Sequence, residues 1–267
     1  MPRMGAVAQL FVTIAFLANA SFARADQLTI VGTGDGLDML RAVASSYSEK
    51  NPGHDIVVPP SIGSGGGIAA VASDREMMGR VARPLSDLEL AQGIKVIGVA
   101  RIPSAIYVNP KVTVADITTV QLAGIFGGSI TNWKDLGGAD QKIRVVRRED
   151  GDSTLQALRG SMPGWKELAI TPLSKQAVTT QDAIESVAKV DGAIGFGPFS
   201  RNLEPGVKVL KIDGRMPIDA GYPSAVSLAL IYKAAREDAE IRSFIDFIKS
   251  QSGIAIIDSF GAVPLTN

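Results

Sequence analysis

Leu28-Thr29-Ile30-Val31-Gly32-Thr33-Gly34-Asp35-Gly36 is the stretch that decides the fold, because a β-branched run ends there in a glycine-rich loop. Apolar residues then recur at helical spacing, at Leu37, Leu40, Val43, Ala44 and Tyr47. The same unit returns at Ile56 to Val58, Gly63 to Gly67 and Ile68 to Ala72. Repeated strand–loop–helix units with short connections predict an α/β protein whose sheets are largely parallel. Ligands of such sheets bind at the carboxyl ends of the strands, beside helix N-termini.

The rest of the chain continues this alternation of strands and helices. Apolar runs predict strands at Lys95 to Ala100, Ala105 to Val108, Ile143 to Val146, Ala193 to Phe196, Val207 to Ile212 and Val226 to Tyr232. Helical spacing predicts helices at Thr118 to Phe126, Ser153 to Ser161, Gln181 to Lys189 and Ala239 to Ser250. About 240 residues beyond a leader are too many for one small core and suit two lobes.

The first residues are typical of a secretory signal peptide. Arg3 precedes an apolar run from Ala6 to Ala20, and Ala23-Arg24-Ala25 is a small-x-small cleavage pattern. We therefore expect residues 1–25 to be a signal peptide and the protein to act in the periplasm. The run is shorter than the roughly 20 residues of a spanning helix, so we expect no membrane insertion of the mature chain. The absence of cysteine excludes an N-terminal lipid anchor on cysteine, disulfides and thiol catalysis.

The charge balance limits the partners. The chain has 27 basic and 27 acidic residues, so it lacks the global positive field of a nucleic-acid-binding protein. His54 is the sole histidine and lies in a polar turn, so we expect neither a metal site nor another cofactor. An anion must therefore be held by local geometry.

Three loops place small or hydroxyl residues where a helix begins. They are Gly32 to Gly36, Gly63 to Gly67 and Gly151 to Thr154. Backbone N–H groups at such positions point along the helix dipole and favour an anion, although ordinary capping is the alternative for any one loop. The hydroxyls of Ser64, Ser153 and Thr154 would add donors.

Arg148 is the candidate cation of this site. The strand ending at Val146 delivers it to the turn before Gly151, and the carboxylate of Asp150 is placed to fix its guanidinium. Strand alternation points Arg147 and Glu149 the other way, so we expect these two to face solvent.

Several motifs together resemble the periplasmic phosphate-binding proteins of ABC transporters. They are the early glycine loop, Gly63 to Gly67, Arg83-Pro84-Leu85-Ser86-Asp87, Ile125-Phe126-Gly127-Gly128-Ser129-Ile130-Thr131-Asn132-Trp133, Arg148-x-Asp150-Gly151 and Gly192 to Phe196. The resemblance spans nearly the whole mature chain and implies a two-lobed type II periplasmic binding protein fold with two chain crossings at the hinge. The crossings are expected near Ala105 to Asn109 and Ala225 to Ile231. Residues 26–104 with 226–267 would form lobe 1, and residues 105–225 lobe 2. Phe126 and Trp133 would be core.

The resemblance also implies the function and the site. The protein would capture phosphate or a phosphate-like small oxyanion for a membrane ABC permease, as a monomer and not as an enzyme. The candidate ligand-binding residues, including the arginine beside the proline–leucine pair, are Gly34, Asp35, Gly36, Ser64, Arg83, Arg148, Asp150, Asp152, Ser153 and Thr154. In the first glycine loop, Asp35-Gly36-Leu37 stands where a threonine and a phenylalanine of the family would be expected.

Two positions depart from the family. Ala82 stands where the phosphate binders have an aspartate that accepts the proton of the ligand, and Asp152 stands where they have a serine. Asp152 either caps the helix that begins near Ser153 or takes over the role of proton acceptor from the other lobe. Arg80 and Arg83 would offset the added negative charge, with strand alternation turning only one of them to the cleft.

Other functions stay open at this point. The protein could bind a different anion, such as an organic phosphate or a carboxylate, or serve as an anion sensor subunit that reports to a membrane kinase. Gly151-Asp152-Ser153 also matches the nucleophile motif of a serine esterase family, but Ser153 would need a histidine base and His54 lies far upstream.

Overall fold

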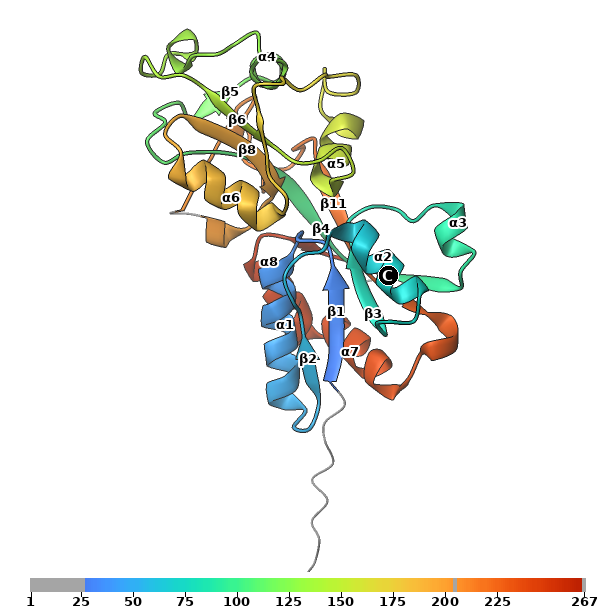
Figure 1. The fold of residues 1–267 in the computed structure, drawn as a ribbon. Helices are drawn as coiled ribbons and strands as arrows, with labels where there is room; N and C mark the ends of the chain where they lie inside the picture. The colour runs from blue at the N-terminus through green and yellow to red at the C-terminus, as the bar shows by residue number, and fades with distance from the viewer. Residues whose placement is uncertain (1–26, 204–205, 266–267) are drawn as a thin grey trace, which may run out of the picture.

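The computed structural model describes residues 27–203 and 206–265, and the predicted signal peptide 1–25 lies outside them. The described chain is an α/β protein of two lobes joined by two long strands (Figure 1). Within the described ranges no helix has the length and apolar character needed to cross a membrane.

Lobe 1 is built on a sheet with the strand order β2-β1-β3-β11-β4. Its strands are β1 (Gln27–Gly32), β2 (Asp55–Val57), β3 (Met78–Val81), the first part of β4 (Ile94–Val108), β11 (Ala225–Lys233) and β12 (Val263–Pro264). Its helices are α1 (Leu37–Lys50), α2 (Gly63–Ala72), α3 (Asp87–Leu90), a short helix at Ala234–Arg236, α7 (Ala239–Lys249) and α8 (Gln251–Ser259). Helices α1, α7 and α8 pack together on one face, and α2 packs on β3 at the other.

Lobe 2 continues from the second part of β4 in the order β4-β8-β6-β7. Its strands are β5 (Asp116–Ile117), β6 (Arg144–Arg147), β7 (Lys175–Gln176), β8 (Ala193–Pro198), β9 (Lys208–Val209) and β10 (Lys211–Ile212). Its helices are α4 (Thr119–Gly127), α5 (Ser153–Ser161), α6 (Thr180–Lys189) and short turns at Trp133–Leu136 and Arg201–Leu203. Phe126 and Trp133 are buried in its core, as predicted, and Trp165 packs on Phe126 with ring centroids 5.0 Å apart.

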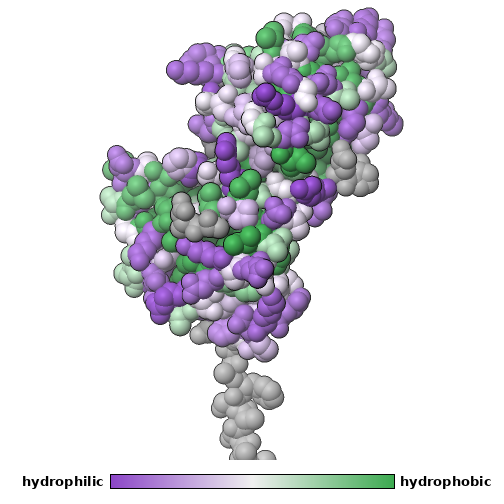
Figure 2. All heavy atoms as spheres, turned by 180° about the vertical axis from the view of Figure 1, so that it is seen from behind, coloured by the Kyte–Doolittle hydropathy of each residue, from purple (hydrophilic) through white to green (hydrophobic). Residues whose placement is uncertain are grey.

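The two crossings lie side by side. Strand β4 pairs with β11 as far as Pro103 and with β8 from Ser104 onward. At this change of partner, Ser224 Oγ donates to Ser104 Oγ at 2.8 Å, and Ser104 N donates to the Ser224 carbonyl at 2.9 Å. The division into residues 26–104 with 226–267 and 105–225 stays a prediction, and this change of partner supports it. Seen from behind, the surface narrows between the lobes, with hydrophilic and hydrophobic residues interspersed (Figure 2).

Three expectations about the strands were wrong in detail. The pairs β1–β2, β1–β3, β6–β7 and β6–β8 are parallel as predicted, but β11 and β4 run antiparallel to their neighbours. In lobe 1, β11 runs opposite to β1 and β3 while β4 runs in their direction, and in lobe 2, β4 runs opposite to β6 and β8. The runs at Lys95 to Ala100 and Ala105 to Val108 belong to one strand, and Val207 to Ile212 splits into β9 and β10.

Candidate anion-binding cleft

A cleft of about 260 Å³ lies between the lobes, where three helices begin. Helix α2 of lobe 1 faces helices α5 and α6 of lobe 2, so three sets of first-turn N–H groups, which have no partner within their own helix, converge. The lining residues are Thr33, Gly34, Ser61, Ile62, Gly63, Ser64, Gly65, Gly66, Arg148, Glu149, Gly151, Asp152, Ser153 and Thr180. This arrangement suits a small anion.

Ser64 and Ser153 join the lobes across the cleft. Their hydroxyl oxygens are 3.0 Å apart, and either can donate. Ser64 Oγ also accepts from the backbone N–H of Ala82 at 3.1 Å. The structure thus brings two predicted hydroxyl donors together on the ligand side of α2 and α5.

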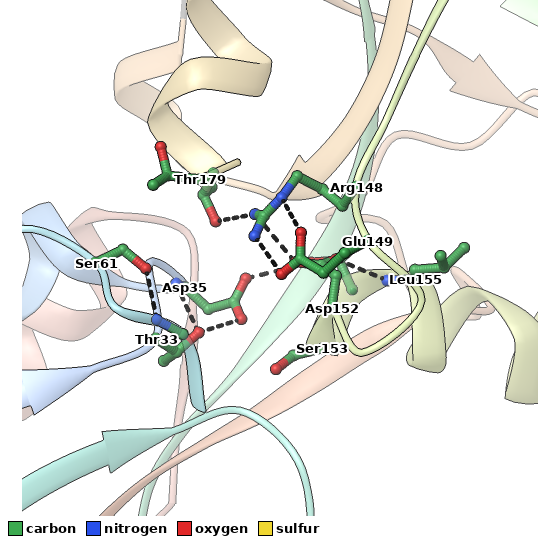
Figure 3. A network of polar contacts seen from close by, with 12 residues as sticks. Thr33, Asp35, Ser61, Arg148, Glu149, Asp152, Ser153, Leu155 and Thr179 are labelled. Atoms are coloured by element: carbon green, nitrogen blue, oxygen red, sulfur yellow. Dashed lines mark hydrogen bonds and ion pairs between the residues drawn. The ribbon is translucent and has the colours of Figure 1, made fainter. Parts of the chain in front are cut away.

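Asp35 belongs to the first glycine loop, and its side chain is buried. Thr33 Oγ1 donates to its Oδ2 at 2.7 Å (Figure 3). Thr154 Oγ1 donates across the lobes to its Oδ1 at 3.2 Å. Burial raises the pKa of this carboxyl, against the lowering effect of the two threonine hydroxyls and Arg148. The hydroxyl of Thr154 therefore donates to Asp35, and Thr154 is not among the residues that line the cleft.

The glycines of the first loop differ in role. Gly34 lines the cleft, and a Cβ on it would come within 2.7 Å of Thr180 Oγ1 in the opposite lobe. Gly36 precedes α1 with a positive φ of 66° and lies beside the cleft rather than on its lining. The predicted loop is thus a close contact between the lobes as well as a source of donors.

Arg148 supplies the positive charge, but its partners are not the predicted ones. Its Nε and Nη2 donate to Glu149 at 3.0 and 2.8 Å, and its Nη1 contacts Asp152 Oδ2 and Thr180 Oγ1, both at 3.0 Å (Figure 3). Asp150 instead points outward to Arg159, at 3.1 Å.

The pairing of Arg148 corrects two expectations, namely that Asp150 fixes the guanidinium and that Glu149 faces solvent. The physical reason is that β6 ends at Arg147, so Arg148, Glu149 and Asp150 lie in a turn where the alternation of a strand does not apply. Arg147 lies half-buried, and its side chain donates to the carbonyl of Arg148.

Asp152 caps helix α5, which confirms the first of its two expected roles. Its Oδ1 accepts from the Leu155 N–H at 3.0 Å while its Oδ2 pairs with Arg148. Burial and the nearby charge of Asp35 raise its pKa to about 7, although Arg148 acts in the opposite direction. Its role as proton acceptor stays a prediction.

Neither arginine near Ala82 reaches the cleft. Arg83 forms a two-bond pair with Glu89, at 3.0 and 2.8 Å, because the capping box of Ser86 and Glu89 holds that carboxylate beside it. Arg80 is fully buried and donates to the carbonyls of Ile30, Thr33 and Pro59. Burial lowers its pKa to about 10, with Arg41 as a second cause.

Sequence reasoning missed four lining residues, Ser61, Ile62, Glu149 and Thr180. Helix α6 was predicted from Gln181 and begins at Thr180 behind the capping Thr179, but its N-terminus was not assigned to the site. The hydroxyl pair Thr179-Thr180 before an apolar-periodic run was the available signal for this N-terminus. The position of Thr180 opposite Gly34 depends on how the two lobes pack against each other.

The arrangement gives Ser153 no histidine base. His54 lies at the start of β2 in lobe 1, where its Nδ1 is 3.4 Å from Glu240, whereas Ser153 Oγ contacts Ser64. In the described part of the chain no cluster of three potential metal-ligating side chains occurs. Ser153 therefore has the hydroxyl of Ser64, and not the ring of His54, as a side-chain partner.

Comparisons with known proteins identify the family of this chain. Residues 18–252 match the model of the PBP superfamily domain. The phosphate-binding protein PstS of Bacillus subtilis is 30% identical over 256 residues, covering 90% of this chain and 81% of that protein. PstS of Borreliella burgdorferi is 28% identical and covers 67% of this chain and 69% of its own.

Solved structures show the same relationship. A phosphate ABC transporter substrate-binding protein from Clostridium perfringens, solved with bound phosphate, is 29% identical with a TM-score of 0.81, covering 90% of this chain and all of that one. An ABC-type phosphate transport receptor from Vibrio cholerae is 25% identical with a TM-score of 0.64, covering 88% and 99%. The chain belongs to the PBP superfamily, in the family that includes the phosphate-binding proteins PstS.

Proposed function

We propose that this protein binds phosphate between its lobes and delivers it to an ABC transporter in the membrane, acting in the periplasm as a monomer. The observation that carries the proposal is the meeting of Arg148 with the N-termini of α2, α5 and α6 in one cleft. The names of the relatives from Bacillus subtilis and Clostridium perfringens support it.

Each lobe contributes part of the set of hydrogen-bond donors for the ligand. Lobe 1 offers Ser64 and the first-turn N–H groups of α2, and lobe 2 offers Arg148, Ser153 and Thr180. Neither lobe holds the full set of donors, so phosphate favours the state in which both contact it. The chain therefore acts as a binding protein rather than an enzyme.

The acidic side chains make a protonated ligand the better match. Asp35 and Asp152 lie close enough to influence each other, and each has a raised pKa. A carboxylate there can accept the proton of a hydrogen phosphate, which fully ionised sulfate lacks. Ala82 has no side-chain acceptor, so the role would fall to Asp152, which lines the cleft, whereas both oxygens of Asp35 accept from threonine hydroxyls.

Titration calorimetry of the purified protein tests the proposal. We expect phosphate to bind, sulfate to bind more weakly, and Arg148→Lys to weaken phosphate binding about tenfold or more, since a point charge cannot replace the planar fork. Arg159→Lys is the matched control, because Arg159 pairs with Asp150 outside the cleft. Absence of phosphate binding, or equal affinity in Arg148→Lys, would contradict the proposal.

Phosphate esters and small carboxylates, measured in the same series, test whether the protein binds other anions. Pull-down with a membrane permease or with a sensor kinase tests whether the protein is a transporter subunit or a sensor subunit.

A further inference from the structure

The cleft-lining side of Arg148 is occupied by a carboxylate of the protein itself. Nε and Nη2 of Arg148 donate in parallel to the two carboxylate oxygens of Glu149, at 3.0 and 2.8 Å. Both residues line the cleft. Two parallel N–H donors are the geometry with which arginine binds a ligand carboxylate or phosphate. Glu149 therefore holds the position that two oxygens of an oxyanion would take.

Glu149 is not needed to orient the guanidinium. The other end of the group, Nη1, is fixed by Asp152 and Thr180, both at 3.0 Å. The Arg148 side chain is 5% exposed, whereas that of Glu149 is 41% exposed. Glu149 can thus turn into water while Arg148 stays in place.

We propose, on the basis of the function proposed above, that Glu149 is an internal competitor for Arg148 and sets the threshold that an anion must exceed to bind. An incoming oxyanion can accept hydrogen bonds from Nε and Nη2 of Arg148, the fork of the guanidinium, only if the two bonds that these atoms make to Glu149 are broken. The free energy lost in this exchange is the same for every anion that uses the fork.

The shape of the anion then decides which ligands pass the threshold. A carboxylate ligand exchanges one carboxylate for another at the fork and gains little. A tetrahedral oxyanion presents further oxygens to Ser64, Ser153 and the N-termini of α2 and α5, so it keeps a net gain. Glu149 would in this way exclude abundant small carboxylates without contacting the bound phosphate.

Glu149→Gln, which keeps the shape but removes the charge, tests the proposal together with Glu149→Ala. Calorimetry with phosphate and with acetate should show both anions binding about threefold to tenfold more tightly to the variants, in line with one partly exposed charged pair. Acetate binding should become measurable. Glu89→Gln is the matched control, because Glu89 makes the same two-bond pair with Arg83 outside the cleft and glutamine preserves its capping role.

The direction of the change in phosphate affinity shows whether Glu149 competes with the ligand or supports Arg148. Weaker or unchanged phosphate binding in both Glu149 variants would overturn the proposal, and weaker binding would make Glu149 a positioning residue for Arg148. A crystal structure with phosphate in which Glu149 still bonds Nε and Nη2 would overturn it as well. If the natural chain binds no phosphate but the Glu149 variants bind acetate more tightly than it does, the proposed function fails and the competitor stands.

Discussion

The two buried arginines, Arg80 in lobe 1 and Arg148 in lobe 2, satisfy their charges in different ways. Arg80 donates to backbone carbonyls of β1, of the loop after β1 and of the segment before α2. Arg148 meets the side chains of Glu149, Asp152 and Thr180. Main-chain carbonyl groups are fixed by the fold, whereas side chains can turn away. The comparison separates a cation that fixes the scaffold from one whose partners can be exchanged for a ligand.

The largest expected effect is that of Arg80→Met on folding. The substitution leaves buried carbonyls without donors, and we expect a loss of about 3 kcal/mol or more in the free energy of unfolding. Denaturant unfolding measures it, with Arg41→Met as the control, because Arg41 also donates to a carbonyl, that of Val58, but lies partly exposed. If Arg80→Met does not fold, Arg80→Lys, with fewer donors, should show a smaller loss. A change below about 1 kcal/mol would remove the distinction between the two arginines.

A second variant tests whether the two regions communicate at the cleft. Arg80 holds the Thr33 carbonyl, and the next residue, Gly34, lies against Thr180, which in turn bonds Arg148. A Cβ in Gly34→Ala would meet Thr180 at 2.7 Å, so the lobes should close incompletely and phosphate should bind about tenfold more weakly, since overpacking costs about 1–3 kcal/mol.

Solution scattering with and without phosphate, combined with calorimetry, measures the effect of Gly34→Ala. Gly160→Ala is the control, because a Cβ there meets no atom within 4 Å. If Gly34→Ala shows the same ligand-dependent decrease in radius of gyration and the same affinity as the natural chain, the lobes do not need this contact.

The smallest expected effect concerns pH and Asp152. Burial, together with the charge of Asp35, raises its pKa in the folded state from the ordinary value of 3.8 to about 7, so the folded protein binds more protons than the unfolded one between these values. This carboxyl therefore favours folding below about pH 4 and loses that contribution as pH rises to 7. Asp152→Asn keeps the helix cap and should flatten this fall, by an amount on the order of 1–2 kcal/mol.

Unfolding titrations at several pH values measure the effect of Asp152→Asn. Asp182→Asn gives the contrasting control, because the pKa of Asp182 is lowered by hydrogen bonds, chiefly from the Val178 N–H, and its contribution is lost only as pH falls below the unfolded value. An unchanged slope between pH 4 and 7 in Asp152→Asn would mean that Arg148 keeps this carboxyl ionised.

Periodicity and glycine placement were enough to predict the elements that build the cleft. Helix α5 spans the residues predicted for it, and the pattern that begins at Leu37 gives α1. Such patterns depend on local spacing, and local spacing survives in the fold. The family motifs then placed Ser64, Arg148 and Ser153 in one cleft, where the structure has them.

The partners of the arginines could not be predicted from local pattern. Whether Glu149 or Asp150 meets Arg148 depends on where β6 ends, a boundary that spacing leaves open by a residue or two. Arg80 was equally uncertain, because the carbonyls that hold it come from segments about 20 to 50 residues away in the chain. Thr180 joins the site only because lobe 2 places α6 opposite Gly34.

The positions of the tryptophans determine which changes in this protein intrinsic fluorescence can detect. The chain has two, Trp133 and Trp165, both buried in the core of lobe 2 and neither on the lining of the cleft. Intrinsic emission will therefore follow the unfolding of lobe 2 and stay nearly constant when an anion enters between the lobes. Because the sequence contains no cysteine, a single cysteine at the rim of the cleft can carry a dye without competition from other thiols. The protein is thus a ready scaffold for an optical anion sensor.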